Sequence, residues 1–354
     1  MLAENLFKDI TYSFETSLEP LGRQSNQFQG IGHSVISIEN FFMANRLDWY
    51  CFYDKTDNYV LFIDTGNPLI SGSAFLDNAL NSYGVGWEDT DIFLTHFHID
   101  HAGNLSYCLK QGARNAFYIA PEVYDDSLVS SFFIWTHASD VIRGDKDAIE
   151  HLELLFGKCY FEDVDSAKCH VLTGKEVFDI AGFHLEVMPT PGHAPEHACL
   201  IDVQRKLLVA GDHLIFARPG MMQLEPDQHL MHHYVENIKT LAANDFDLVL
   251  MSHHAPLTDS NKTKEFIRHT WKSYENFLPQ MKDLVASLGN VNVYGLASHL
   301  AGRHPQGINC FAPAFQVRRL SLAFGTLEGL YDYGLVERRQ DDDGSLVYFV
   351  NRRR

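Results

Sequence analysis

Cysteine is scarce in this sequence, and the cysteines that are present form no recognisable unit. Six cysteines are spread over 354 residues without a C-x-x-C pair, so no disulfide framework is predicted. A chain of this length can bury a sizeable core without cross-links, and we expect reduced thiols. The N-terminus lacks a basic stretch followed by an apolar one. We therefore predict no signal peptide and a cytoplasmic location.

Long apolar runs and excess positive charge are also missing. No run approaches the roughly 20 apolar residues that a membrane-spanning helix requires, so no membrane partner is expected. The net charge of −18 repels polyanions and disfavours nucleic acid as a partner. The acidic excess lies in residues 1–260, whereas residues 261–354 carry a small basic excess. This change of sign indicates a domain boundary near residue 260.

Short apolar strands alternate with helical stretches in the first part of the chain. Apolar, β-branched or alternating runs predict strands at residues 59–63, 91–94, 116–120, 176–189, 198–202, 207–210 and 248–251. Residues 102–112 and 229–243 have helical patterns. Polar residues gather where the strands end, which is typical of an α/β sandwich whose site lies on strand-end loops.

The strongest signal is an H-x-H-x-D-H run that follows the strand at 91–94. Alternate side chains of an extended segment lie on one side, so His96 and His98 can share one metal ion. Asp100 and His101, just beyond, can turn toward a second position. Imidazole and carboxylate are ligands that Zn²⁺ accepts.

Further ligand candidates stand on turns that leave later strands. His193 follows a Pro-Gly turn, and Asp212 lies in a Gly-Asp-His turn. The last ligand is either His253 or His254, with His213 as a third alternative. Two ions about 3.5–4 Å apart need this many ligands, and one of them usually bridges.

These motifs resemble those of the metallo-β-lactamase superfamily. The resemblance covers residues 30–258 and rests on five ordered motifs, which are DTG at 64–66, THFHIDHAG at 95–103, TPGHAPEH at 190–197, GDH at 211–213 and HHAP at 253–256. It implies a four-layer αβ/βα sandwich with the metal ions at one edge. It also implies a first ion on His96, His98 and His193, a second on Asp100, His101 and His254, and a bridging Asp212. The family's last histidine usually precedes a small residue and Pro, which favours His254 over His253.

The details of the motifs refine this resemblance. The first motif is that of glyoxalase II-like hydrolases, and His98 stands where flavodiiron-like members have Glu, which disfavours redox chemistry. Zinc is the favoured ion, with iron or manganese as alternatives. Glu196 stands where relatives usually have Gly, and Ser252-His253 replaces a more common Pro-Gly. These departures remove no ligand but change the rim of the pocket.

The rest of the chain predicts two additions to the catalytic domain at residues 1–260. Residues 122–175 are rich in aromatics and form a candidate lid insertion. Residues 261–354 are predicted to form a mostly helical, winged-helix-like domain. The prediction rests on a long helix at 262–288, a helix at 324–333 and a hairpin of 335–339 with 346–350. This arrangement is similar to the β-lactamase-like 2 group.

The predicted function is that of a dinuclear metal-dependent hydrolase acting through a metal-bound hydroxide. Asp100 would act as the general base, and Asp64 would fix the loop that bears His96 and His98. The acidic surface and the glyoxalase II-like motifs favour a small ester, thioester or lactone. An RNA-cleaving nuclease is the alternative, supported by Arg338 and Arg339 in the basic C-terminal part. A metal-binding regulatory protein with little turnover is a third hypothesis, and a homodimer is left open.

Overall fold

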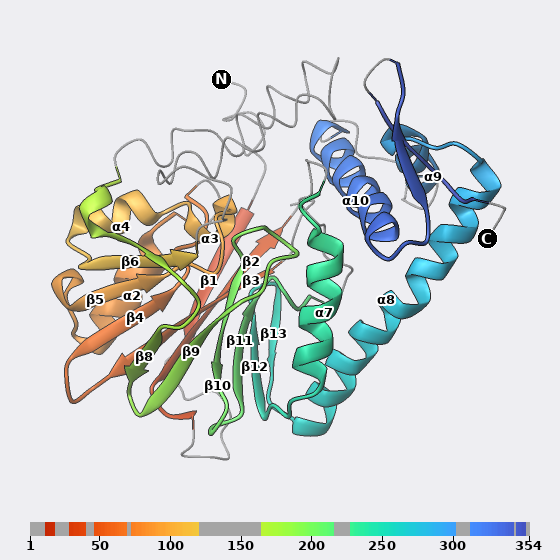
Figure 1. Cartoon of the computed structure of the whole chain (residues 1–354). Coiled ribbons are helices and arrows are strands. Elements are labelled where there is room, and N and C mark those ends of the chain that lie inside the picture. Colours follow the sequence, from red (N-terminus) through yellow and green to blue (C-terminus); the bar gives the residue numbers. More distant parts are fainter. Residues whose placement is uncertain are drawn as a thin grey trace.

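The computed structural model describes residues 11–17, 28–39, 46–68, 72–119, 164–215, 227–301, 312–342 and 345–351. In these residues the chain forms two β-sheets that face each other, with helices on the outer face of each sheet (Figure 1). This agrees with the predicted α/β sandwich. None of the helices in the described ranges is long and apolar enough to cross a membrane.

The first sheet has seven strands in the order β1-β2-β3-β4-β5-β6-β7. The pairs from β1 to β4 are antiparallel, and those from β4 to β7 are parallel. Parallel neighbours need crossover connections. Helix α2 (Ala74–Tyr83) lies in the crossover from β4 to β5, and the short helices α3 (Ile99–Ala102) and α4 (Leu105–Gln111) lie in that from β5 to β6. The strands are β1 (Thr11–Ser17), β2 (Ile31–Glu39), β3 (Arg46–Asp54), β4 (Tyr59–Ile63), β5 (Thr90–Phe93), β6 (Asn115–Ile119) and β7 (Cys169–Leu172).

The second sheet has six strands in the order β13-β12-β11-β10-β9-β8. Its strands β8 to β11 form an antiparallel meander, and helix α7 (Leu230–Ala242) crosses over to the parallel strand β12. The strands are β8 (Val177–Ile180), β9 (Phe183–Pro189), β10 (Ala198–Asp202), β11 (Leu207–Gly211), β12 (Leu248–Met251) and β13 (His254–Leu257). The strands predicted at 59–63, 198–202 and 248–251 are confirmed to the residue.

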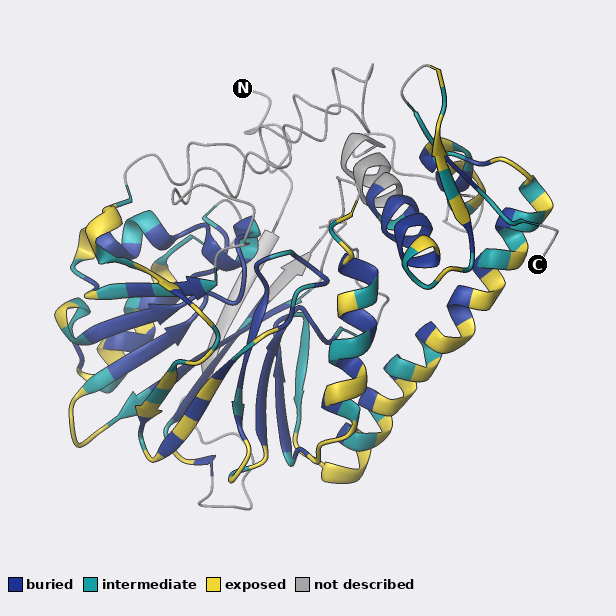
Figure 2. Cartoon of the chain, viewed as in Figure 1, coloured by how far each residue is buried: buried dark blue, intermediate teal, exposed yellow. Residues whose placement is uncertain are grey.

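Three clusters of buried side chains hold the four layers together. One packs α2 and α4 on the first sheet, and a second fills the space between the sheets, where the rings of Phe52 and Phe183 meet edge to face at 5.1 Å. The third lies between the second sheet and helices α7 and α8. Figure 2 shows most strand residues of both sheets as buried. Burial on both faces explains why the strands read as continuous apolar runs in the sequence.

The C-terminal part packs on the outer face of the second sheet. It contains α8 (Ser260–Leu288), α9 (Val293–Ala301), α10 (Ala312–Asp332) and a hairpin of β14 (Glu337–Gln340) with β15 (Leu346–Phe349). The predicted long helix and hairpin are confirmed, whereas their description as a winged helix stays a prediction.

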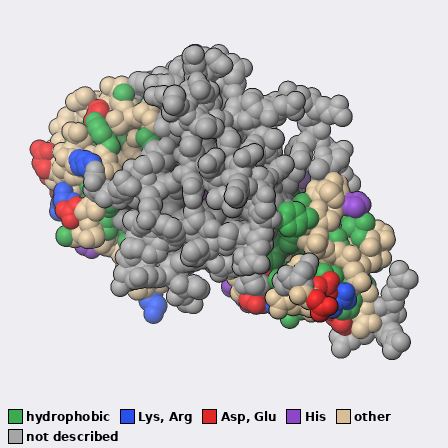
Figure 3. Space-filling model, turned by 90° about the horizontal axis from the view of Figure 1, so that it is seen from above, with side chains coloured by type: hydrophobic (Ala, Val, Ile, Leu, Met, Phe, Trp, Pro, Cys, Tyr) green, Lys and Arg blue, Asp and Glu red, His purple; other side chains and the backbone are tan. Residues whose placement is uncertain are grey.

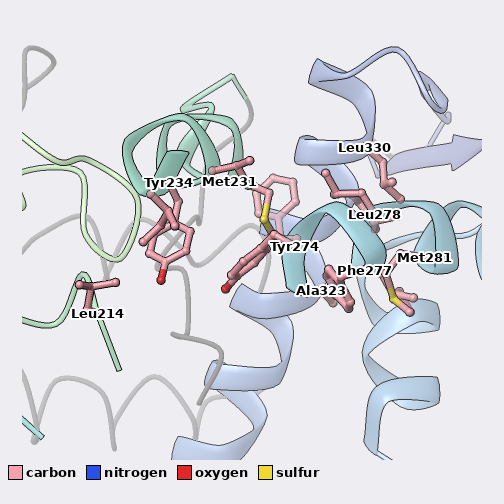
Figure 4. Close-up of a cluster of buried hydrophobic side chains, with 14 of the residues drawn as sticks. Leu214, Met231, Tyr234, Tyr274, Phe277, Leu278, Met281, Ala323 and Leu330 are labelled. Carbon is pink, nitrogen blue, oxygen red and sulfur yellow. The ribbon is translucent and has the colours of Figure 1, made fainter. Parts of the chain in front are cut away.

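The C-terminal helices share a core with the second sheet. Tyr234 of α7 packs near Tyr274 of α8, with ring centroids 5.1 Å apart, and Ala323 of α10 belongs to the same cluster (Figure 4). A buried carboxylate reinforces this packing, because Glu328 of α10 accepts hydrogen bonds from Arg338 and from the backbone N–H of Asp227. The region after residue 260 is therefore built onto the outer layer of the sandwich.

The predicted lid insertion at 122–175 differs in part from the structure. Residues 169–172 are strand β7 of the first sheet, paired in parallel with β6, and do not form part of an insertion. The four residues of β7 are too few for a strand pattern to be recognised in the sequence without knowledge of the pairing with β6. The aromatic residues on which the lid prediction rests lie outside the described residues.

Candidate metal centre

The predicted ligand motifs meet at one edge of the sandwich, on loops at strand ends. The run from His96 to His101 starts in the loop after β5 and ends within α3, and His193 lies between β9 and β10. Asp212 directly follows β11, and Ser252-His253 forms the turn between β12 and β13. Tight packing aims Asp212: Gly211 has φ +50, and a Cβ there would lie 3.0 Å from Thr95. Glycine is needed at this position for both reasons.

A first group of potential ligands consists of His96, His98, His193 and Asp212. The Nδ1 of His98 lies 2.9 Å from Nε2 of His96 and 3.0 Å from Nε2 of His193. Tetrahedral coordination of one zinc ion separates ligand nitrogens by about 3.3 Å. The three imidazoles are thus about as close together as ligands of a single ion.

A second group consists of Asp100, His101 and His253. Asp212 of the first group also lies close to the second group. Its Oδ2 is 3.4 Å from Nε2 of His193 in the first group and 3.0 Å from Nε2 of His253 in the second. Its Oδ1 is 3.5 Å from Nε2 of His101. The arrangement has the form of two adjacent metal positions with one carboxylate between them.

The polar atoms of this cluster fit a bound cation. Nε2 of His101 and Oδ1 of Asp212 are buried and have no hydrogen-bond partner among the described residues. Leaving such groups unpaired is costly, and a divalent ion between them would satisfy both. Seven nitrogen and oxygen ligands match the donor set that zinc accepts.

Burial and charge divide the histidines of the metal-free protein into two kinds. Burial lowers the pKa of His98 to about 4 and that of His193 to about 3, so both are neutral and ready to bind metal at pH 7. For His253, burial acts against protonation, but Asp212 and Asp100 raise its pKa to about 10. The same carboxylates raise the pKa of His101. These two histidines therefore carry protons next to the carboxylates of Asp100 and Asp212.

Asp64, which we predicted to fix the loop that bears His96 and His98, is hydrogen-bonded to that segment. Its carboxylate accepts hydrogen bonds from the backbone N–H of Thr95 at 2.7 Å and from Nδ1 of His101 at 2.8 Å. The second bond directs Nε2 of His101 toward Asp212. Asp64 has φ +64, an uncommon value for a residue with a Cβ, and Trp49 donates to its carbonyl oxygen at 2.8 Å.

The structure brings His253 to the cluster, and not the predicted His254. Nδ1 of His253 is 3.2 Å from the carbonyl oxygen of Arg46, and its Nε2 faces Asp100 and Asp212. His254 begins β13, and its Nδ1 lies 2.9 Å from the carbonyl oxygen of Ala255. His253 stands in the turn before β13, and of the two histidines only His253 belongs to a ligand group. His213, the third alternative, is buried but lies outside both groups.

His197 was not recognised as part of the site from the sequence, and Glu196 was expected only to change the rim of the pocket. His197 accepts a hydrogen bond from the backbone N–H of Asp212 at 3.3 Å, and its Nδ1 is 2.8 Å from Oγ1 of Thr190. Glu196 accepts one from the backbone N–H of Phe97 at 3.1 Å. Both stand in the TPGHAPEH motif, in which Glu196 replaces a more common Gly.

The fold and the cluster define a two-sheet α/β protein whose strand-end loops carry a set of potential metal ligands. A family model described as the metallo-beta-lactamase superfamily matches residues 50–253, which is more than half of the chain. The chain therefore belongs to the metallo-β-lactamase superfamily, whose members are mostly metal-dependent hydrolases.

Curated relatives match at low identity. The chain is 26% identical over 153 residues to lactamase-like protein aptB of Emericella nidulans, covering 43% of this chain and 47% of that protein. It is 25% identical over 206 residues to lactamase-like protein nscB of Arthroderma gypseum, covering 58% of each. The chain thus spans roughly half of the length of these relatives.

Solved structures share the fold over most of the chain. A metallo-beta-lactamase family protein from Thermus thermophilus aligns with a TM-score of 0.68 and 20% identity, covering 91% of this chain and 99% of that chain. A beta-lactamase domain protein from Burkholderia ambifaria aligns with a TM-score of 0.70 and 18% identity, covering 91% of each. Because this coverage exceeds residues 50–253, the shared fold extends beyond the family segment.

Proposed function

We propose that this protein is a hydrolase that uses two divalent metal ions to cleave a small ester, thioester or lactone. The observation that carries the proposal is the pair of ligand groups on either side of Asp212. His96, His98 and His193 would hold the first ion, and Asp100, His101 and His253 the second. When bound, two such ions supply an activated water at neutral pH and polarise the scissile carbonyl.

Asp100 is the residue that we assign to proton transfer. Its side chain is 25% exposed, compared with 6% for Asp212 and 1% for His101. It is therefore the ligand-group carboxylate that incoming water and substrate can reach. His253 and His101 hold the pKa of Asp100 well below its usual range, although burial opposes this. The carboxylate is thus ionised and can orient a water molecule by accepting a hydrogen bond from it.

Zinc is the ion that we favour. The two groups offer five imidazoles and two carboxylates but no thiolate, a set that suits zinc and also admits iron or manganese. Metal content after expression in defined media, measured by mass spectrometry, would decide among the three.

The charges of the described residues favour a small substrate over RNA. The guanidinium of Arg338 is paired with Glu328 and Asp227, and that of Arg339 with Asp341 at 2.9 Å. Both guanidinium groups are thus paired with carboxylates. In the view from above, the described Lys and Arg side chains are few and scattered (Figure 3). The name lactamase-like of the two fungal relatives is compatible with cleavage of a carbonyl–heteroatom bond.

The test is hydrolysis by zinc-, iron- and manganese-loaded protein of a thioester, a lactone, a phosphodiester and single-stranded RNA, with Asp100→Asn as control. We expect metal-dependent cleavage of a thioester or lactone, with kcat about 10²–10⁴-fold lower in Asp100→Asn. Cleavage of RNA alone would favour the nuclease. Two bound ions without turnover on any substrate would favour the regulatory protein. An unchanged kcat in Asp100→Asn would exclude the role of Asp100.

A further inference from the structure

Glu196 is a buried carboxylate inside a loop that carries two histidines of the site region. It is 6% exposed and stands between His193 and His197. Its Oε1 accepts a hydrogen bond from the backbone N–H of Phe97, the residue between His96 and His98. The side chain thus connects the two segments that supply the imidazoles of the first group.

Glu196 acts from outside the ligand set. Its oxygens do not belong to either group of potential ligand atoms, which lie within 4.8 Å of one another. It is joined to the site through the backbone of Phe97 instead. Phe97 is 2% exposed, so its N–H has little access to water. Leaving such a group without an acceptor costs about 1–3 kcal/mol.

A second hydrogen bond joins the same two segments on the other side of His96. The backbone N–H of Ala198 donates to the carbonyl oxygen of Thr95 at 2.8 Å. His96 therefore lies between two attachments to the loop that carries His193, one made by the backbone and one by Glu196. Metal sites tolerate deviations of only about 0.2 Å in ligand distances. Losing one attachment allows His96 and His98 to move relative to His193 by more than this.

We infer that Glu196 is a positioning residue for the first metal ion, through the hydrogen bond that it accepts from Phe97. The inference rests on the proposed function, because it requires that His96, His98 and His193 bind an ion. Residues that orient metal ligands contribute about 10–100-fold to affinity. Glutamine retains an acceptor oxygen at the same position and is expected to replace Glu196, whereas alanine is not.

The experiment is titration of the metal-free full-length protein with Co²⁺ and Zn²⁺ in competition with a chelator. Wild type, Glu196→Gln and Glu196→Ala are compared, each also in a His253→Ala background that leaves only the first group complete. We expect Glu196→Ala to bind the first ion about 10–100-fold more weakly and to change the visible spectrum of bound Co²⁺. Glu196→Gln should match wild type in both respects.

Glu176→Ala is the matched control. Glu176 accepts backbone hydrogen bonds from Thr173 and Gly174 in the turn between β7 and β8, and it belongs to neither ligand group. Its loss should lower the melting temperature without changing metal affinity or the Co²⁺ spectrum. If Glu196→Ala does not fold, Glu196→Asp, whose carboxylate is one methylene shorter, takes its place.

The outcomes separate this inference from the proposed function. Wild type that binds no ion would overturn both. Wild type that binds two ions, with Glu196→Ala binding the first at the same affinity and with the same spectrum, would overturn the inference alone. A Glu196→Gln protein as weak as Glu196→Ala would also overturn it, because charge and not the hydrogen bond would then be responsible.

Discussion

Replacing His253 by alanine tests whether His253, and not the adjacent His254, is a ligand of the metal centre. In the metal-free protein, Nε2 of His253 lies 3.0 Å from Asp212 and 3.4 Å from Asp100. These carboxylates raise the pKa of His253 to about 10 against the effect of burial. The imidazolium, whose side chain is 18% exposed, is therefore one partner of a partly buried ion pair, and we expect its removal to cost about 3 kcal/mol, the low end of the range for buried pairs.

The His253→Ala protein should be less stable without metal and should lose the second ion. A loss of about 3 kcal/mol corresponds to a fall in Tm of about 4 °C for a chain of 354 residues. The raised pKa means that this stabilisation is present in full below the unfolded-state value near 6.5 and disappears as the pH rises through about 10. The difference in Tm between wild type and His253→Ala should accordingly shrink as the pH approaches about 10.

His254→Ala is the matched control, since His254 belongs to neither ligand group. Calorimetric unfolding of the metal-free proteins and chelator competition with Zn²⁺ give the two readouts. We expect His254→Ala to behave as wild type in both. A weaker second ion in His254→Ala, with normal binding in His253→Ala, would refute the assignment and restore the prediction made from the sequence.

Two further predictions concern protons and the C-terminal part. Adding Zn²⁺ to metal-free protein at pH 7 in weak buffer should release about two protons, because His101 and His253 have raised pKa values and must deprotonate to bind. A pH-indicator dye measures the released protons. Zinc binding without proton release would contradict the ion pairs of these two histidines with Asp100 and Asp212. Replacing the fully buried Glu328 by alanine should lower the free energy of unfolding by about 3–5 kcal/mol in urea denaturation. The exposed Glu337, replaced in the same way, should have little effect, and equal losses would contradict the role of burial.

Much of the fold follows from local sequence patterns. The strands at 59–63 and 248–251 are apolar because both faces of each sheet are covered, and this leaves a strong signal in the residues themselves. Strand β7, with the pattern Cys-His-Val-Leu, has a partly exposed face and no such signal. It becomes a strand because β6 offers an edge for pairing, which is a property of the sheet and not of the segment.

The metal centre shows the same division between local and tertiary information. The sequence by itself determined the H-x-H-x-D-H run, His193 and Asp212 as candidates, because metal chemistry demands these residue types and strand ends mark their place. Only the tertiary structure decided between His253 and His254. Strand β3 holds the turn through bonds from Asp48 to the carbonyl oxygen of Ser252 and between Arg46 and His253. These contacts join residues some two hundred positions apart, so no local pattern could carry them.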